Sequence, residues 1–179
     1  MSIVTFTETI FSAKAKEGVL PGPDSDGYYT VVLGGLNCYN SAGEYYVADN
    51  VIDMFRESSV FMRRVKNASL FSEVGHPRRV PGMSFNDFYS RIIDIVDTNI
   101  CGHISEVSLD MAFGQKNPEL KSPEMIAIMG KVKPAGAQAE TLRLSLENRK
   151  QNTAFSIRGL TENKERNGRV ERHLTRIVT

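Results

Sequence analysis

Two short stretches, eighty positions apart, carry residue types that together could break an acyl bond. Ser156 lies in the stretch Thr153–Leu160, between two large apolar residues, and Arg158 and Gly159 follow it closely. His76 lies in the other stretch, Leu70–Pro77. A serine hydroxyl becomes a strong nucleophile when an imidazole takes its proton. The two stretches are therefore candidates for a serine–histidine site, although a serine on the polar face of a half-buried strand is also an ordinary structural feature.

Strands are expected to position both side chains. Alternation from Phe155 to Leu160 predicts a strand with Ser156 and Arg158 on one face. The short apolar stretch Leu70–Val74 predicts another strand, and the sequence Gly75-His76-Pro77 interrupts it. Glycine frees the backbone torsions before the histidine, and proline cannot continue a strand ladder. We therefore expect the imidazole at a strand end.

The rest of the chain divides into further strand-like and helix-like segments. β-Branched and aromatic runs predict strands at Ile3–Phe6, Tyr28–Leu36, Ile100–Phe113, Met125–Val132 and Val170–Thr179. One helix is expected from Ala48, with one face formed by Ile52, Phe55, Ser59, Met62 and Val65. Two more are expected after the N-cap Ser84 and over Ala137–Lys150, and Asn167-Gly168 predicts a hairpin turn.

Composition indicates an ordinary globular protein. The 179 residues suit a single domain, with 41% hydrophobic and 24% charged residues. The net charge of +1 indicates neither nucleic acid nor an acidic membrane as the main partner. Cys38 and Cys101 have no CxxC spacing, so they predict neither a disulfide framework nor a zinc site. The N-terminus lacks the pattern of a secretion signal, and no apolar run approaches the ~20 residues of a membrane span.

Metal and nucleic acid are the alternative ligands. His103 and Glu106 are three positions apart, with His173 as a further ligand, but in a strand His103 and Glu106 face opposite sides and cannot chelate together. The lysines and arginines of residues 164–176 are interleaved with glutamates, which favours a solvated hairpin over a nucleic-acid site. We expect no metal and no cofactor.

Four segments, taken in order, resemble the prohead proteases of tailed bacteriophages, the T-even type and its giant-phage relatives. They are Asn40–Tyr46 before a helix, the histidine segment Phe71–Pro77, the strand Met125–Val132 with the turn at 134–136, and the serine segment Phe155–Leu160. This chain departs from the family pattern at Ser72, where a glycine is usual, and in a first segment that lacks its arginine.

The resemblance implies a serine endopeptidase with Ser156 as nucleophile and His76 as general base. Arg158 and Gly159 would then bind the oxyanion or the substrate. The family cleaves scaffold or core proteins and capsid proteins inside the prohead, in the host bacterial cytoplasm, and also cleaves itself. Its cleavage motifs end in an acidic residue, so the resemblance implies a basic pocket, for which Arg78, Arg79 and Arg158 are the candidates.

The third member of the triad is expected on the last strand, just beyond Thr179. On that expectation the C-terminal end is truncated and the enzyme impaired. Substitutes within the chain are Glu171, His173 and Asp110, and the sequence does not choose between them.

The expected fold is a single α+β domain over residues 1–179. It is a mostly antiparallel β-sandwich or barrel with two or three flanking helices, similar to phage tail-tube proteins. The resemblance also implies a homo-oligomer, with a ring as one form, and no membrane or specific nucleic-acid partner. The alternative function is a non-catalytic capsid-core or tube-type structural protein with the same fold.

Overall fold

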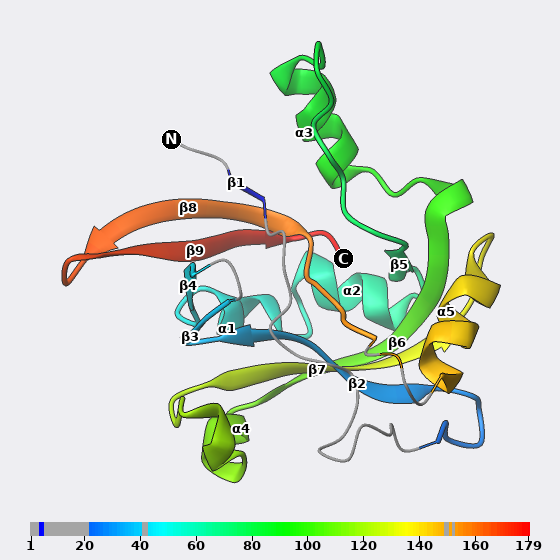
Figure 1. Ribbon diagram of the computed structural model, residues 1–179, viewed down its shortest axis with the longest axis horizontal. Coiled ribbons are helices and arrows are strands. Elements are labelled where there is room, and N and C mark those ends of the chain that lie inside the picture. The colour runs from blue at the N-terminus through cyan, green and yellow to red at the C-terminus, as the bar shows by residue number, and fades with distance from the viewer. Residues whose placement is uncertain (1–3, 6–21, 41–42, 149–150, 152) are drawn as a thin grey trace.

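The computed structural model describes residues 4–5, 22–40, 43–148, 151 and 153–179 (Figure 1). Two β-sheets form its framework. Several expectations lie outside these ranges: the strand residues Ile3 and Phe6, residues 41–42 of the first motif, and the last helical positions 149–150.

The four-stranded sheet is antiparallel throughout and has the order β2-β7-β6-β5. Its strands are β2 (Tyr29–Leu36), β7 (Ile126–Pro134), β6 (Ile100–Asp110) and β5 (Phe71–Glu73). The short edge strand β5 leads to the histidine motif. Its register with β6 shifts between Ser72 and Glu73, and such irregularities re-aim side chains near sites.

The five-stranded sheet has the order β1-β8-β9-β4-β3. Its strands are β1 (Val4–Thr5), β8 (Gly159–Arg166), β9 (Arg169–Ile177), β4 (Tyr45–Val47) and β3 (Cys38–Tyr39). The β4–β9 pair is parallel and the other pairs are antiparallel. The predicted hairpin is confirmed: Asn167 and Gly168 have φ of 53° and 72°, as a two-residue turn with two left-handed positions requires.

One hydrophobic core joins the two sheets. The four-stranded sheet contributes side chains such as Val31, Ile104 and Val132, and the five-stranded sheet contributes Leu174 and Ile177. The helices are α1 (Val51–Met54), α2 (Val60–Lys66), α3 (Phe85–Ile93), α4 (Phe113–Lys116) and α5 (Ala139–Glu147), with 3₁₀ turns at Asp97–Asn99 and Pro118–Leu120. Because α1 contacts β9 while α2 and α5 contact β6, these helices help to close the core.

The expected helix from Ala48 is wrong in one respect, because the structure divides it into α1 and α2. Ser59 was placed on the apolar face but is instead the N-cap of α2. Its Oγ accepts a hydrogen bond from the Met62 N–H at 3.1 Å and donates to the Met54 carbonyl at 2.6 Å. A serine side chain satisfies backbone groups better at a helix start than inside a helix, so the break falls at this residue.

The strand predicted over Phe155–Leu160 begins only at Gly159. Gly159 pairs with Ile177, the last residue of β9, and the Arg158 backbone pairs with residues 178–179. Residues 153–158 before it lie outside this ladder, with one isolated bridge at Ala154. The serine therefore lies in a segment that leads into β8.

The expected α+β class with mostly antiparallel strands is confirmed, and the structure arranges the strands in two sheets. The helix after Ser84 is also confirmed as α3, which projects from the sheets in Figure 1. Among the described residues, no helix has the length and apolar character that would let it cross a membrane.

Candidate active site

A cavity of about 350 Å³ contains both sequence motifs. Ser156 and His76 line it, together with Glu73 and Arg158. Its remaining wall is largely apolar and comes from both sheets, α2 and α5; examples are Phe61, Leu70, Ile104, Ile128, Leu142 and Ile177. The fold thus brings the two predicted stretches to one place.

Ser156 is positioned by its two apolar neighbours. Phe155 and Ile157 are 9% and 7% exposed, so their side chains fix the segment in the core. Ile157 packs against β2, where a Cβ on Gly34 would lie 2.8 Å from the Ile157 Cδ1 atom. The Ser156 Oγ is buried and has no hydrogen-bond partner among the described residues. The hydroxyl is therefore not committed to another side chain or backbone group among the described residues.

His76 follows β5 by three residues. Gly75 has φ of 71°, which confirms that the backbone before the histidine uses a torsion that glycine allows. His76 is exposed as a residue and lines the cavity. Since the Ser156 Oγ has no partner within the part of the chain that the structure describes, the two side chains line the same cavity without a hydrogen bond between them. Catalytic hydrogen bonds are often made only when substrate is bound.

Arg158 is buried and paired with a carboxylate. Its Nη1 lies 2.6 Å from the Glu73 Oε2, and the two side chains are 4% and 2% exposed. Burial lowers the pKa of the Arg158 guanidinium, and the Glu73 charge acts in the opposite direction. The Arg158 Nε and Nη2 atoms have no hydrogen-bond partner among the described residues. A cation with two uncommitted donors therefore lies in the wall of the cavity.

The backbones of Arg158 and Gly159 take part in strand pairing with the C-terminal residues. The Arg158 N–H donates to the Thr179 carbonyl at 2.5 Å, and the Val178 N–H donates to the Arg158 carbonyl at 2.8 Å. Gly159 does not line the cavity, and a Cβ on it would lie 2.3 Å from the Arg176 carbonyl oxygen. Within the described ranges, the Arg158 guanidinium thus keeps unpartnered donors, whereas the Arg158 amide is occupied by the Thr179 carbonyl.

Arg78 and Arg79, the other candidates for a basic pocket, are exposed and do not line the cavity. Arg79 donates to the Met83 carbonyl at 3.3 Å, within the loop before α3. Arg158 is therefore the one member of that group of three that the fold places beside Ser156.

The substitutes for a third triad member lie elsewhere. Glu171 is bound by Arg169 at 3.0 Å and lies 3.4 Å from the His173 ring nitrogen. Asp110 is paired with Lys116 at 2.9 Å. None of the three candidates lines the cavity.

The metal alternative has no geometric support in the described part of the chain. The His103 Nδ1 is 2.9 Å from the Tyr28 hydroxyl, and Glu106 pairs with Lys131 at 3.1 Å. The described residues contain no group of three or more histidine, cysteine or acidic side chains arranged to hold a metal ion.

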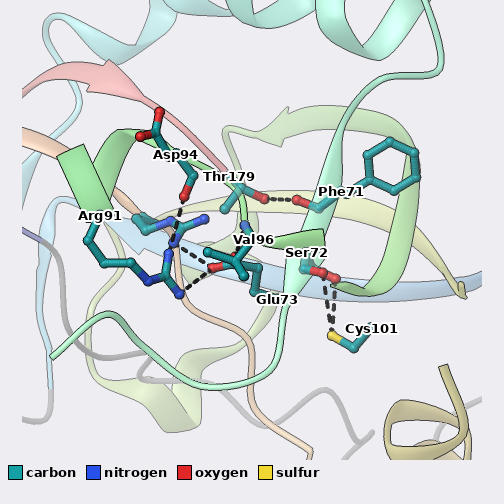
Figure 2. Close-up of polar contacts among 9 residues, drawn as sticks. Phe71, Ser72, Glu73, Arg91, Asp94, Val96, Cys101 and Thr179 are labelled. Carbon is teal, nitrogen blue, oxygen red and sulfur yellow. Dashed lines mark hydrogen bonds and ion pairs between the residues drawn. The ribbon is translucent and has the colours of Figure 1, made fainter. Parts of the chain in front are cut away.

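Glu73 is a charged cavity residue to which sequence reasoning gave no role, although it lies in the histidine motif. Its carboxylate contacts Arg158, Arg91 and the Val96 N–H (Figure 2 shows the last two). The signal was present: a carboxylate inside the apolar stretch Leu70–Val74 has to find a partner if that stretch is buried. What the sequence could not supply was the partner's identity.

Comparison with known proteins identifies a family and a relative. A family model described as the peptidase S80 family matches residues 6–179. A capsid maturation protease of Pseudomonas phage phiKZ is 38% identical over 151 residues, which are 82% of this chain and 54% of that protein. The chain thus spans about half the length of this curated relative (54%). No solved structure matches it.

Proposed function

The chain belongs to the peptidase S80 family, and from this premise we propose that it is a serine endopeptidase acting through Ser156 and His76. Its resemblance to the phage prohead proteases is confirmed by the family match and by the relative from phage phiKZ. The serine mechanism, the site residues and the substrates are the content of the proposal.

The reaction is acyl transfer in two steps. The His76 imidazole takes the proton of the Ser156 hydroxyl as the oxygen attacks the carbonyl carbon of the scissile peptide. The imidazolium then gives that proton to the leaving amine, which leaves an acyl-enzyme that water hydrolyses. Negative charge develops on the carbonyl oxygen at each attack, and the Arg158 guanidinium is the nearby group that can stabilise it.

The observation that carries the proposal is the shared cavity. Ser156 and His76 are eighty positions apart, in segments that adjoin strands of different sheets, yet both line the same cavity. The buried, unpartnered Ser156 Oγ supports the role of nucleophile, because buried hydroxyls are normally hydrogen-bonded. The unpartnered donors of Arg158 support the role of oxyanion stabiliser in the same way.

The substrates we propose are scaffold or core proteins and capsid proteins of the phage prohead, with self-cleavage as an additional reaction. The relative's name, capsid maturation protease, supports this class of substrate and a place of action inside the prohead. The positive charge of Arg158 in the cavity wall would attract an acidic substrate residue next to the cleaved bond.

The test uses the purified chain with a fluorophosphonate probe and with prohead proteins of the phage that encodes it. A fluorophosphonate phosphonylates an activated serine oxygen with loss of fluoride and needs no knowledge of the cleavage motif. We expect labelling at Ser156 and discrete protein fragments, and loss of both in Ser156→Ala. The control Ser58→Ala removes an exposed serine outside the cavity and should behave as the unmodified chain does.

Each outcome decides between the alternatives. Cleavage that persists in Ser156→Ala removes this serine as nucleophile, and turnover unchanged in His76→Ala removes the histidine as base. No labelling and no cleavage by any variant favours the non-catalytic capsid-core or tube-type protein.

A further inference from the structure

Glu73 joins three parts of the molecule through one carboxylate. Its Oε2 accepts hydrogen bonds from Arg158 Nη1 at 2.6 Å and from Arg91 Nη2 at 3.0 Å. Its Oε1 accepts from the backbone N–H of Val96 (Figure 2). Arg91 lies on α3, Val96 lies in the segment after it, and Arg158 lies two residues after Ser156.

The position of Glu73 along the chain matters as much as its contacts. It lies three residues before His76, at the end of β5 in the four-stranded sheet. Arg158 directly precedes β8 in the other sheet. The 2.6 Å ion pair therefore connects the histidine segment to the serine segment, across the boundary between the two sheets.

The side chains of Glu73, Arg91 and Arg158 leave a net positive charge near Ser156, which the charge of nearby Asp94 reduces. One carboxylate faces two guanidinium groups, so the three side chains carry a formal sum of +1. Arg91 is 24% exposed and is screened in part by solvent, whereas Arg158 is 4% exposed. In a site with little water, such a charge acts strongly on a nearby developing anion.

The geometry of the pair leaves part of the guanidinium unused. Only Nη1 of Arg158 donates to Glu73, and Nε and Nη2 have no partner among the described residues. A bidentate arginine–carboxylate pair would have occupied two of these nitrogens. Because the contact is through a single nitrogen, Glu73 anchors one end of the guanidinium and leaves Nε and Nη2 uncommitted among the described residues.

We propose that Glu73 is a positioning residue for proteolysis: it holds the Arg158 guanidinium so that the free donors meet the oxyanion formed at Ser156. It also holds the histidine and serine segments at their working separation. This inference rests on the proposed function, since it requires Ser156 to be the nucleophile. Glu73 acts through Arg158 and takes no part in proton transfer.

The first test compares Glu73→Gln with Glu147→Gln. Glutamine keeps the shape and one acceptor oxygen but removes the charge. Glu147 is a matched control, because it also pairs with an arginine, Arg143 at 2.5 Å, but on the exposed face of α5. We would measure thermal stability, the rate constant for fluorophosphonate labelling, and kcat and KM with a prohead protein that the unmodified chain cleaves.

The expected result separates positioning from support of the fold. In Glu73→Gln that is folded at the assay temperature, labelling and kcat should fall about 10- to 100-fold, while KM changes by less than about 3-fold. Glu73→Asp, which keeps the charge on a shorter stem, should react at an intermediate rate. A merely structural role would reduce the fraction of folded, labelled protein and leave the rate constant of that fraction unchanged.

The outcomes also separate this inference from the proposed function. If the unmodified chain labels at Ser156 and folded Glu73→Gln labels at the same rate, the role of Glu73 is refuted and the serine mechanism stands. If the unmodified chain is not labelled at Ser156, the proposed function fails first. Should Glu73→Gln not fold, Glu73→Asp decides, because labelling at the unmodified rate by that variant overturns the inference.

Discussion

Replacing Gly159 with alanine should destabilise the protein, because the new methyl group has no space. The added Cβ would lie 2.3 Å from the Arg176 carbonyl oxygen and 3.1 Å from Leu174 Cδ2. The first of these is a backbone atom, so β8 and β9 have to separate to accept it. Overpacking of this kind typically costs about 1–3 kcal/mol. For a chain of this size, about 2–4 °C per kcal/mol predicts a Tm lower by about 2–12 °C.

The assay is thermal unfolding followed by circular dichroism, with Gly22→Ala as the control. A Cβ on Gly22 meets nothing within 4 Å, so that variant should stay within about 0.5 kcal/mol of the unmodified protein. Displacement at Gly159 should also slow labelling of Ser156 in the folded protein, because the serine segment enters β8 there. A Gly159→Ala protein with an unchanged Tm would refute the close packing of β8 on β9.

Two further predictions concern Cys38 and Glu171, which do not line the cavity. Burial raises the pKa of the Cys38 thiol to about 12 from 9.0, so its thiolate fraction at pH 8 is about 1,000-fold lower than that of an ordinary cysteine. Iodoacetamide should therefore modify Cys38 only after the protein unfolds, which mass spectrometry can show. Rapid modification of the folded protein would contradict this. Burial raises the pKa of Glu171, but hydrogen bonds and charges from Arg169 and Arg166 outweigh it and place the pKa below its usual 4.5. Glu171 thus stabilises the fold above about pH 4.5, and this contribution is lost as pH falls through the lowered pKa. The difference in urea midpoint between Glu171→Gln and the unmodified protein should therefore be larger at pH 7 than at pH 3, and an equal difference at both would contradict it.

Local features were predictable because their causes lie within a few residues. The helix after Ser84 follows from a cap and an apolar period, and the turn at Asn167-Gly168 follows from two residues that tolerate positive φ. The torsion of Gly75 belongs to the same class. The two motifs were recognisable from their order, although their roles remain predictions.

Features that depend on partners were predicted less well. The division of the helix at Ser59 depends on a hydrogen bond to Met54 that competes with continued helix. The start of β8 at Gly159 depends on where β9 supplies a pairing partner. Periodicity cannot detect either effect, because both the helical and the strand pattern continue through these positions.

By itself, the sequence determined the α+β class with mostly antiparallel strands, the hairpin, the helix α3 and the two stretches that carry Ser156 and His76. Only the tertiary structure decided that Arg158 is buried and paired with Glu73, 85 positions away, and that Glu171 and His173 lie outside the cavity. The reason is physical. Alternation and capping act between near neighbours, whereas the partner of a buried charge is set by how two sheets pack, which no single segment encodes.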